Sequence, residues 1–174
     1  MSEQTMDGVD RTRLWHGMFW GMVAAPIAAI VPLTAMLLSF WPAPTPITAT
    51  VLQRFLGVTG MGAYLLAGLG QVLYGGIWGA FLGFVSAPIE PPLLVRPSTM
   101  SIGLGVGLFR AFLASLTALL YVGWGAFGVL VTPLIAVGIL VTDLVFGATV
   151  AFLITREEDG RLHLPFTKLR LHHA

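Results

Sequence analysis

Two oppositely charged side chains stand in the middle of apolar segments, where charge is rarely tolerated. Arg110 lies 11 residues after Thr99, and Asp143 lies 12 residues before Thr155. If both segments are membrane helices, the rise per residue places each charge roughly 16–18 Å from one membrane boundary, near the middle of a core about 30 Å thick. An unpartnered arginine or aspartate at that depth costs about 2.5–3.5 kcal/mol. We therefore expect Arg110 and Asp143 to form an intramembrane ion pair.

Three interpretations of this pair are open. The pair is a structural clasp that fixes the register of neighbouring helices, or it is a titratable or ligand-binding site in which Asp143 carries protons or Arg110 receives an anion. In the third interpretation, one of the two charges faces a partner subunit. Gln71 lies 15 residues before Ser86 in an earlier apolar segment, roughly 22 Å from the same boundary. The candidate polar site therefore comprises Arg110, Asp143 and Gln71.

The composition of the chain indicates that its solvent is a lipid bilayer. Hydrophobic residues make up 56% of the 174 residues and charged residues 10%, and the mean hydropathy is +0.87. A soluble domain carries about 25% charged residues. The net charge of +1 offers no general attraction for nucleic acid, which we do not expect as a partner. The sequence contains no cysteine, which excludes disulfides, thiolate metal ligands and cysteine nucleophiles.

Four apolar segments are long enough to cross a membrane as helices, which requires about 20 residues each. We predict spans over residues 14–40, 59–85, 100–121 and 127–154. Proline-rich breaks follow the first two spans, and Gly123-Trp124-Gly125 forms the turn between the last two. The predicted fold is an all-α, polytopic membrane protein whose four-helix transmembrane bundle occupies residues 14–154. A further short helix over residues 47–56 is expected at the membrane interface.

The segments that flank the bundle carry most of the basic residues. Residues 1–13 form an N-terminal segment whose acidic residues argue against a cleavable signal peptide. Residues 155–174 form a basic, amphipathic tail, either resting on an anionic leaflet or solvated. One side of the bundle has only Arg54, and the other has Arg11, Arg13, Arg96, Arg156, Arg161, Lys168 and Arg170. The positive-inside rule then places both termini in the cytoplasm, in a multi-pass protein of a prokaryotic inner (cytoplasmic) membrane.

Small residues recur at intervals of four within every span. They are Gly17 and Gly21, then Gly75, Gly79 and Gly83, then Gly103 and Gly107, and finally Gly147 with Ala151. Residues four apart share one face of a helix, and small side chains let two backbones approach closely, which supplies contact energy that lipid does not. We predict that these stripes are the packing seams of the bundle, with a dimer seam as the alternative for one of them. Pro26, Pro32 and Pro133 are expected to bend the first and last spans.

Two spans share a local pattern that suggests a repeat. The segment Gln71-Val72-Leu73-Tyr74-Gly75 aligns with Asp143-Leu144-Val145-Phe146-Gly147, and the first and third spans begin with the same spacing of small residues. A duplication would make the chain two tandem helical hairpins in parallel orientation. Chance similarity between apolar helices is the rival explanation, and both remain open.

Motifs in the first half of the chain resemble those of a known group of proteins. They run from Trp15-His16-Gly17 through Gly21-Met22-Val23-Ala24-Ala25 to Gln71-Val72-Leu73-Tyr74-Gly75 and Gly79. These motifs are similar to those of small bacterial and archaeal integral membrane proteins of unknown function, in which a histidine precedes the apolar-Tyr-Gly turn of helix. Gln71 stands in the place of that histidine. The resemblance implies a four-helix membrane fold and no activity, and it argues against a haem or metal ligand at Gln71.

The sequence holds no set of residues typical of an enzyme. It has no glycine-rich phosphate loop, nucleophile elbow, paired catalytic carboxylates or zinc motif, and no span core contains a histidine. We expect no metal or other cofactor, only bound lipids, and a membrane enzyme has the least support. His16 is expected at the inner edge of the first span as an interfacial residue, and Glu157-Glu158-Asp159 as a solvated charge run.

Two functions stand as hypotheses. The first is a non-catalytic integral-membrane subunit, or an assembly or scaffold component, of a larger membrane complex such as a bioenergetic one. Its partners would be membrane lipids and either other integral membrane subunits or a second copy of the chain. The alternative is a small transporter or channel, coupled to protons or anions through the Arg110–Asp143 pair. Because four helices rarely enclose a path, a transporter of this size would have to be an oligomer.

Overall fold

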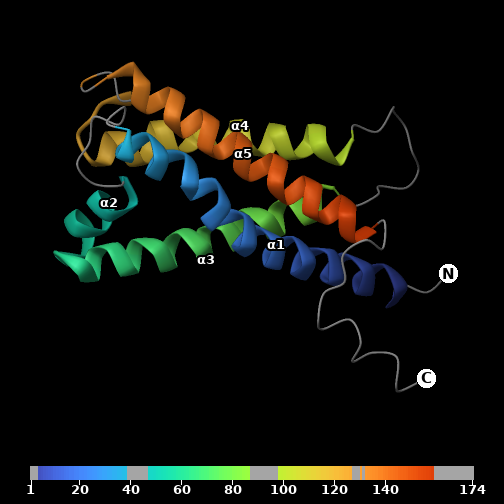
Figure 1. Ribbon diagram of the computed structural model, residues 1–174. Coiled ribbons are helices and arrows are strands. Elements are labelled where there is room, and N and C mark those ends of the chain that lie inside the picture. Colours follow the sequence, from blue (N-terminus) through green and yellow to red (C-terminus); the bar gives the residue numbers. More distant parts are fainter. Residues whose placement is uncertain (1–3, 39–46, 87–97, 127–129, 131, 159–174) are drawn as a thin grey trace.

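The computed structural model describes residues 4–38, 47–86, 98–126, 130 and 132–158. In this part of the chain the regular secondary structure is entirely helical. The helices are α1 (Gln4–Leu37), α2 (Ile47–Leu56), α3 (Met61–Val85), α4 (Thr99–Tyr121) and α5 (Pro133–Glu158) (Figure 1). Four of them, α1, α3, α4 and α5, are long and apolar enough to cross a membrane. The predicted all-α fold with four membrane-spanning helices is therefore confirmed.

The first span differs most from its prediction at the N-terminal side. Helix α1 begins at Gln4, so residues 4–13 are helical and continue into the first span. The stretch of α1 suited to a membrane is Arg11–Ala35, and Pro26 and Pro32 lie inside it. Helices α3 and α4 agree with their predicted spans to within two residues. Most of the predicted C-terminal tail, residues 159–174, lies outside the described residues, as does Arg96.

The fourth span is shorter at its start than predicted, because α5 begins at Pro133 and not at residue 127. The fixed φ of proline and its missing N–H suit the first position of a helix. Thr132 precedes it, and the Thr132 Oγ1 accepts a hydrogen bond of 3.3 Å from the backbone N–H of Leu134, which caps the helix. The expectation that Pro133 bends this span is therefore wrong, since Pro133 starts the helix.

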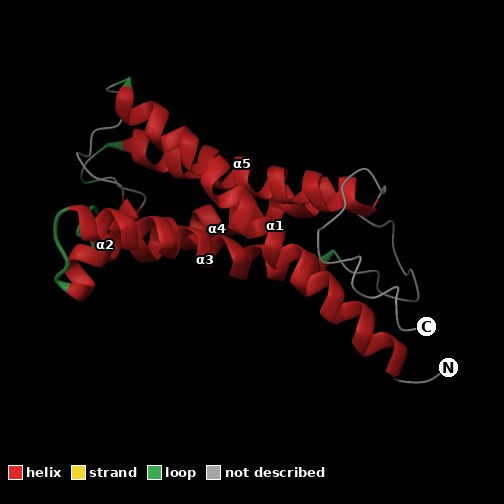
Figure 2. Cartoon of the chain, turned by 60° about the horizontal axis from the view of Figure 1, so that its bottom comes forward, coloured by secondary structure: helices red, strands yellow, loops and turns green. Residues whose placement is uncertain are grey.

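The long helices pair as two hairpins, each made of consecutive spans. Helix α1 packs along α3, and α4 packs along α5, while contact between α1 and α5 joins the two hairpins. The start of α1, the end of α3, the start of α4 and the end of α5 lie toward one end of the molecule, and α2 lies at the other (Figure 1, Figure 2). Helix α2 packs there against α3 and α4. This alternation of direction is what four passes through a bilayer require.

Within each hairpin the two helices meet at glycines. A Cβ atom at Gly79 would lie 2.6 Å from the Gly21 Cα and would collide with the Gly17 carbonyl oxygen. A Cβ atom at Gly103 would lie 2.5 Å from the Gly147 carbonyl oxygen. Real Cβ atoms essentially never approach another atom closer than 3.0 Å, so only glycine fits at these contacts. Such close backbone approach supplies van der Waals energy between helices that lipid cannot drive together.

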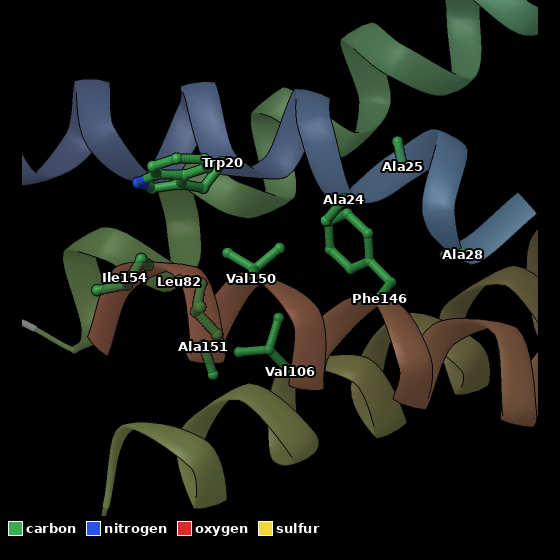
Figure 3. Packing of buried hydrophobic residues seen from close by; sticks show 10 residues of the cluster. All are labelled: Trp20, Ala24, Ala25, Ala28, Leu82, Val106, Phe146, Val150, Ala151 and Ile154. Carbon is green, nitrogen blue, oxygen red and sulfur yellow. The ribbon is translucent and has the colours of Figure 1, made fainter. Parts of the chain in front are cut away.

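The core between the hairpins combines a few large side chains, among them Trp20, Leu82 and Phe146, with several small ones. Phe146 of α5 is fully buried and lies beside Ala24 of α1 (Figure 3), and Ala25 and Ala28 of α1 belong to the same buried cluster. Large apolar side chains are instead common on the outside of the long helices, for example Leu69 of α3. The small residues of α1 therefore allow it to lie close to both α3 and α5, and the larger residues face outward.

Candidate functional site

Arg110 on α4 and Asp143 on α5 lie side by side in the second hairpin. The Arg110 Nε is 2.9 Å from the Asp143 Oδ1, and the two side chains are only 3% and 6% exposed. A hydrogen bond between ionised partners is shorter and stronger than a neutral one, and its strength increases where water is excluded. The structure thus brings together the two charges that the sequence placed at the same depth.

A glycine explains why α4 comes so close to α5 at this level. A Cβ atom at Gly107 would collide with the carbonyl oxygen of Asp143, so the backbone of α4 lies directly against α5. Arg110 follows Gly107 by three residues, almost one turn, and therefore lies on the same face of α4. The glycine seam and the ion pair are consequently parts of one contact.

Two aromatic rings complete the surroundings of the arginine. The Arg110 Cζ lies 4.7 Å from the ring centroid of Tyr74 on α3 and 4.1 Å from that of Phe146 on α5. A guanidinium within about 6 Å of a ring centroid is attracted by the negative face of the ring. Sequence reasoning missed both rings. Phe146 could have been predicted from the sequence, because it follows Asp143 by three residues and so shares its helix face.

Gln71 does not join this cluster. It is half-buried on α3, and within the described residues no hydrogen bond or ion pair links it to Arg110 or Asp143. Tyr74 is the α3 residue that contacts the arginine. Gln71 precedes Tyr74 by three residues and so lies on a similar face of α3, almost one helical turn away. The level at which α3 packs beside α4 therefore places Tyr74 beside the guanidinium.

The glycine contacts also correct the predicted alignment of the two hairpins. A Cβ atom at Gly17 would collide with the Gly79 carbonyl oxygen in the first hairpin. The matching contact in the second hairpin joins Gly103 and Gly147. Gly79 therefore corresponds to Gly147, whereas the predicted alignment matched Gly147 with Gly75, about one helical turn away.

This register leaves the charged pair without a counterpart in the first hairpin. Gly21 approaches the carbonyl oxygen of Gly75 in the same way as Gly107 approaches that of Asp143. In the first hairpin, Gly75 therefore occupies the position that is equivalent to Asp143. Three residues after Gly21, Ala24 holds the position of the arginine. The ion pair is therefore specific to the contact between α4 and α5.

One donor of the arginine remains unsatisfied. The Nη1 of Arg110 is buried and has no hydrogen-bond partner among the residues that the structure describes. A guanidinium offers five N–H donors, and a buried donor without an acceptor costs about 1–3 kcal/mol. The ion pair therefore uses only part of the binding capacity of Arg110.

A second polar cluster, which the sequence did not reveal, joins α1 to the end of α5. The Glu157 Oε2 accepts a hydrogen bond of 2.7 Å from the Trp20 Nε1, and the Glu157 Oε1 lies 3.2 Å from the His16 Nδ1. The Glu157 side chain is only 12% exposed, so the expectation of a solvated charge run is wrong for this residue. A run of three acidic residues does not indicate which member faces the neighbouring helix.

Replacing Glu157 by leucine is expected to lower the free energy of unfolding by about 1–3 kcal/mol, because Trp20 and His16 then lose their acceptor. Glu157→Gln keeps an oxygen for the Trp20 N–H and is expected to lose less. Thermal unfolding of the purified protein in detergent measures both variants. A leucine variant as stable as the wild type would contradict a role for this cluster in holding α1 against α5.

The two clusters differ in the ionisable side chains that they contain. Among the described residues, no group of three or more His, Cys, Asp or Glu side chains has the arrangement needed to hold a metal ion. The Arg110–Asp143 pair offers one cation and one carboxylate that can bind an acceptor or take up a proton. Comparisons with protein families, with curated proteins and with solved structures find no match to this chain.

Proposed function

We propose that the protein is a non-catalytic integral-membrane subunit, or a scaffold component, of a larger membrane complex such as a bioenergetic one. The observation that carries this proposal is the burial of the Arg110–Asp143 pair, whose side chains are 3% and 6% exposed. A pair enclosed in this way acts as a clasp that sets how α4 lies against α5. Removing either partner would leave an uncompensated charge, so the clasp favours one arrangement of the helices.

The outer faces of the helices support an assembly role. Large apolar side chains are exposed on each long helix, among them Ile30 of α1, Leu69 of α3, Leu108 of α4 and Val137 of α5. Such faces suit contact with lipid, with other membrane subunits or with a second copy of the chain. A bundle held by backbone contacts at glycines presents these faces with little freedom to rearrange, which lowers the entropic cost of binding a partner.

Purification from native membranes in a mild detergent, followed by mass spectrometry of the intact assembly, tests this proposal. We expect other integral membrane proteins to co-purify at fixed stoichiometry with the tagged chain. A tagged, unrelated four-span protein expressed at the same level controls for nonspecific association in detergent micelles. Recovery of the chain only as a monomer or as a homodimer would overturn the subunit proposal.

A second candidate is a small oligomeric transporter or channel coupled to protons or anions. The unsatisfied Nη1 of Arg110 favours it, because a buried donor without a partner is a place for a ligand. Homodimers alone in the native purification, together with proton-dependent uptake that is lost in Asp143→Asn, would support this candidate over the first.

For the orientation, we propose that both termini face the cytoplasm of a prokaryotic cell and that the protein lies in its inner membrane. Among the described residues, Arg11, Arg13 and Arg156 lie near the end where α1 starts and α5 finishes. Arg54 lies near the other end, where its Nη1 donates a hydrogen bond of 3.2 Å to the carbonyl oxygen of Tyr121. This asymmetry follows the positive-inside rule.

Cysteine labelling measures this orientation directly, because the chain has no cysteine of its own. Thr59→Cys, in the exposed connection between α2 and α3, is expected to react with a membrane-impermeant maleimide added to spheroplasts. Ser2→Cys and Ala174→Cys are expected to react only after the membrane is broken. Labelling of either terminal cysteine in intact spheroplasts would reverse the proposed topology.

A further inference from the structure

The surroundings of Arg110 leave one of its buried donors without an acceptor among the described residues. Tyr74 and Phe146 lie with their rings against the guanidinium, where they attract its charge but accept no strong hydrogen bond. Asp143 engages the Nε at 2.9 Å. The buried Nη1 therefore needs an acceptor, and no described residue supplies one.

The charge of the site decides what this acceptor can be. With Arg110 positive and Asp143 negative, the pair is neutral as a whole, and an added anion would leave one uncompensated negative charge in the membrane interior. Such a charge is costly there. If Asp143 takes up a proton, the same anion restores neutrality. A proton on Asp143 and an anion on Arg110 are therefore coupled one to one.

The side chains that neighbouring helices place around Asp143 decide whether a second charge would also affect its protonation. Helix α4 contributes Arg110, and α3 contributes Tyr74, which lies against the guanidinium. At the level of Phe146, α1 presents the buried alanine Ala24 (Figure 3). Arg110 is thus the one cation among the described residues that faces the carboxylate, and the close packing favours a small ligand.

We infer that Arg110 binds a small monovalent inorganic anion of the size of chloride, through Nη1, together with one proton on Asp143. The proton comes from a hydronium ion of the aqueous phase, which is left as water, and ends on the carboxylate. The anion accepts the Nη1 hydrogen bond, so the site gains no net charge. By linkage, the proton raises the affinity for the anion, and the anion raises the affinity for the proton by the same factor. This inference deepens the transporter candidate and does not depend on the subunit proposal.

The substitution Asp143→Asn tests this inference, because it fixes the uncharged state of the side chain at every pH. Thermal unfolding of the purified variant in detergent is compared in sodium chloride and in sodium gluconate of equal ionic strength, because gluconate is a much larger anion than chloride. We expect chloride to raise the Tm of Asp143→Asn by about 3–6 °C when it exceeds its Kd about tenfold. The double variant Arg110→Leu/Asp143→Asn, which lacks the cation, is expected to show no difference between the salts.

Wild-type protein provides a second measurement that needs no variant to fold. The stabilisation by chloride over gluconate is expected to be small at pH 7.5 and to increase as the pH falls, because protonation of Asp143 then leaves Arg110 without its counter-ion. Equal Tm values in the two salts at every pH, or an equal chloride effect in the double variant, would overturn the inference. The subunit proposal is decided separately by the proteins that co-purify.

Discussion

Replacing Arg110 by leucine is expected to lower the free energy of unfolding by about 3–5 kcal/mol. Leucine removes the cation and leaves the Asp143 carboxylate, whose side chain is only 6% exposed, without a compensating charge. The contacts of the guanidinium with Tyr74 and Phe146 are lost at the same time. Thermal unfolding in detergent and the amount of folded protein in the membrane measure this loss.

The double variant Arg110→Leu/Asp143→Asn separates the charge effect from the loss of packing. Because it removes both charges, we expect it to recover most of the stability that the single substitution loses. Arg54→Leu is the matched control, since Arg54 is exposed and its substitution is expected to cost less than about 1 kcal/mol. If the double variant is no more stable than Arg110→Leu, the ion pair is not the source of the loss. If the double variant has the stability of the wild type and still co-purifies with the same membrane proteins, a functional role for the charges is excluded.

Adding a single methyl group at Gly79 is expected to have the second largest effect, a loss of about 3 kcal/mol for Gly79→Ala. The new Cβ would meet the Gly17 carbonyl oxygen and would lie 2.6 Å from the Gly21 Cα. Both obstacles are backbone atoms, which cannot move aside as a flexible side chain can. Helices α1 and α3 must therefore separate, and they lose close contact along the whole seam. Thermal unfolding in detergent measures this loss.

Gly68→Ala is the matched control on the same helix. A Cβ atom at Gly68 would meet nothing within 4 Å, and alanine favours a helix over glycine. We therefore expect this variant to be as stable as the wild type or slightly more stable. If Gly79→Ala and Gly68→Ala have the same unfolding temperature, then close approach at the glycine seam does not hold the first hairpin together.

The sequence by itself determined which helices are long and apolar enough to span a membrane and at which level along them the two charges lie. A helix needs about 20 apolar residues to cross a bilayer, and this length can be counted along the chain. Helices α3 and α4 accordingly begin and end within two residues of their predicted spans. The common depth of Arg110 and Asp143 follows in the same way, because the rise per residue is constant. The start of α5 was harder to predict than its length, and Pro133 is the first residue of the helix instead of a position inside it.

Only the tertiary structure decided which side chains meet. Tyr74 and not Gln71 contacts the arginine, and Glu157 joins α1 although it stands in a charge run. In a soluble helix an apolar stripe marks the buried face, but a membrane span is apolar on nearly every side, so its pattern of apolar residues does not show which face points inward. The rotation of each helix about its axis is set instead by contacts such as those at Gly79 and Gly107, where two backbones must fit together.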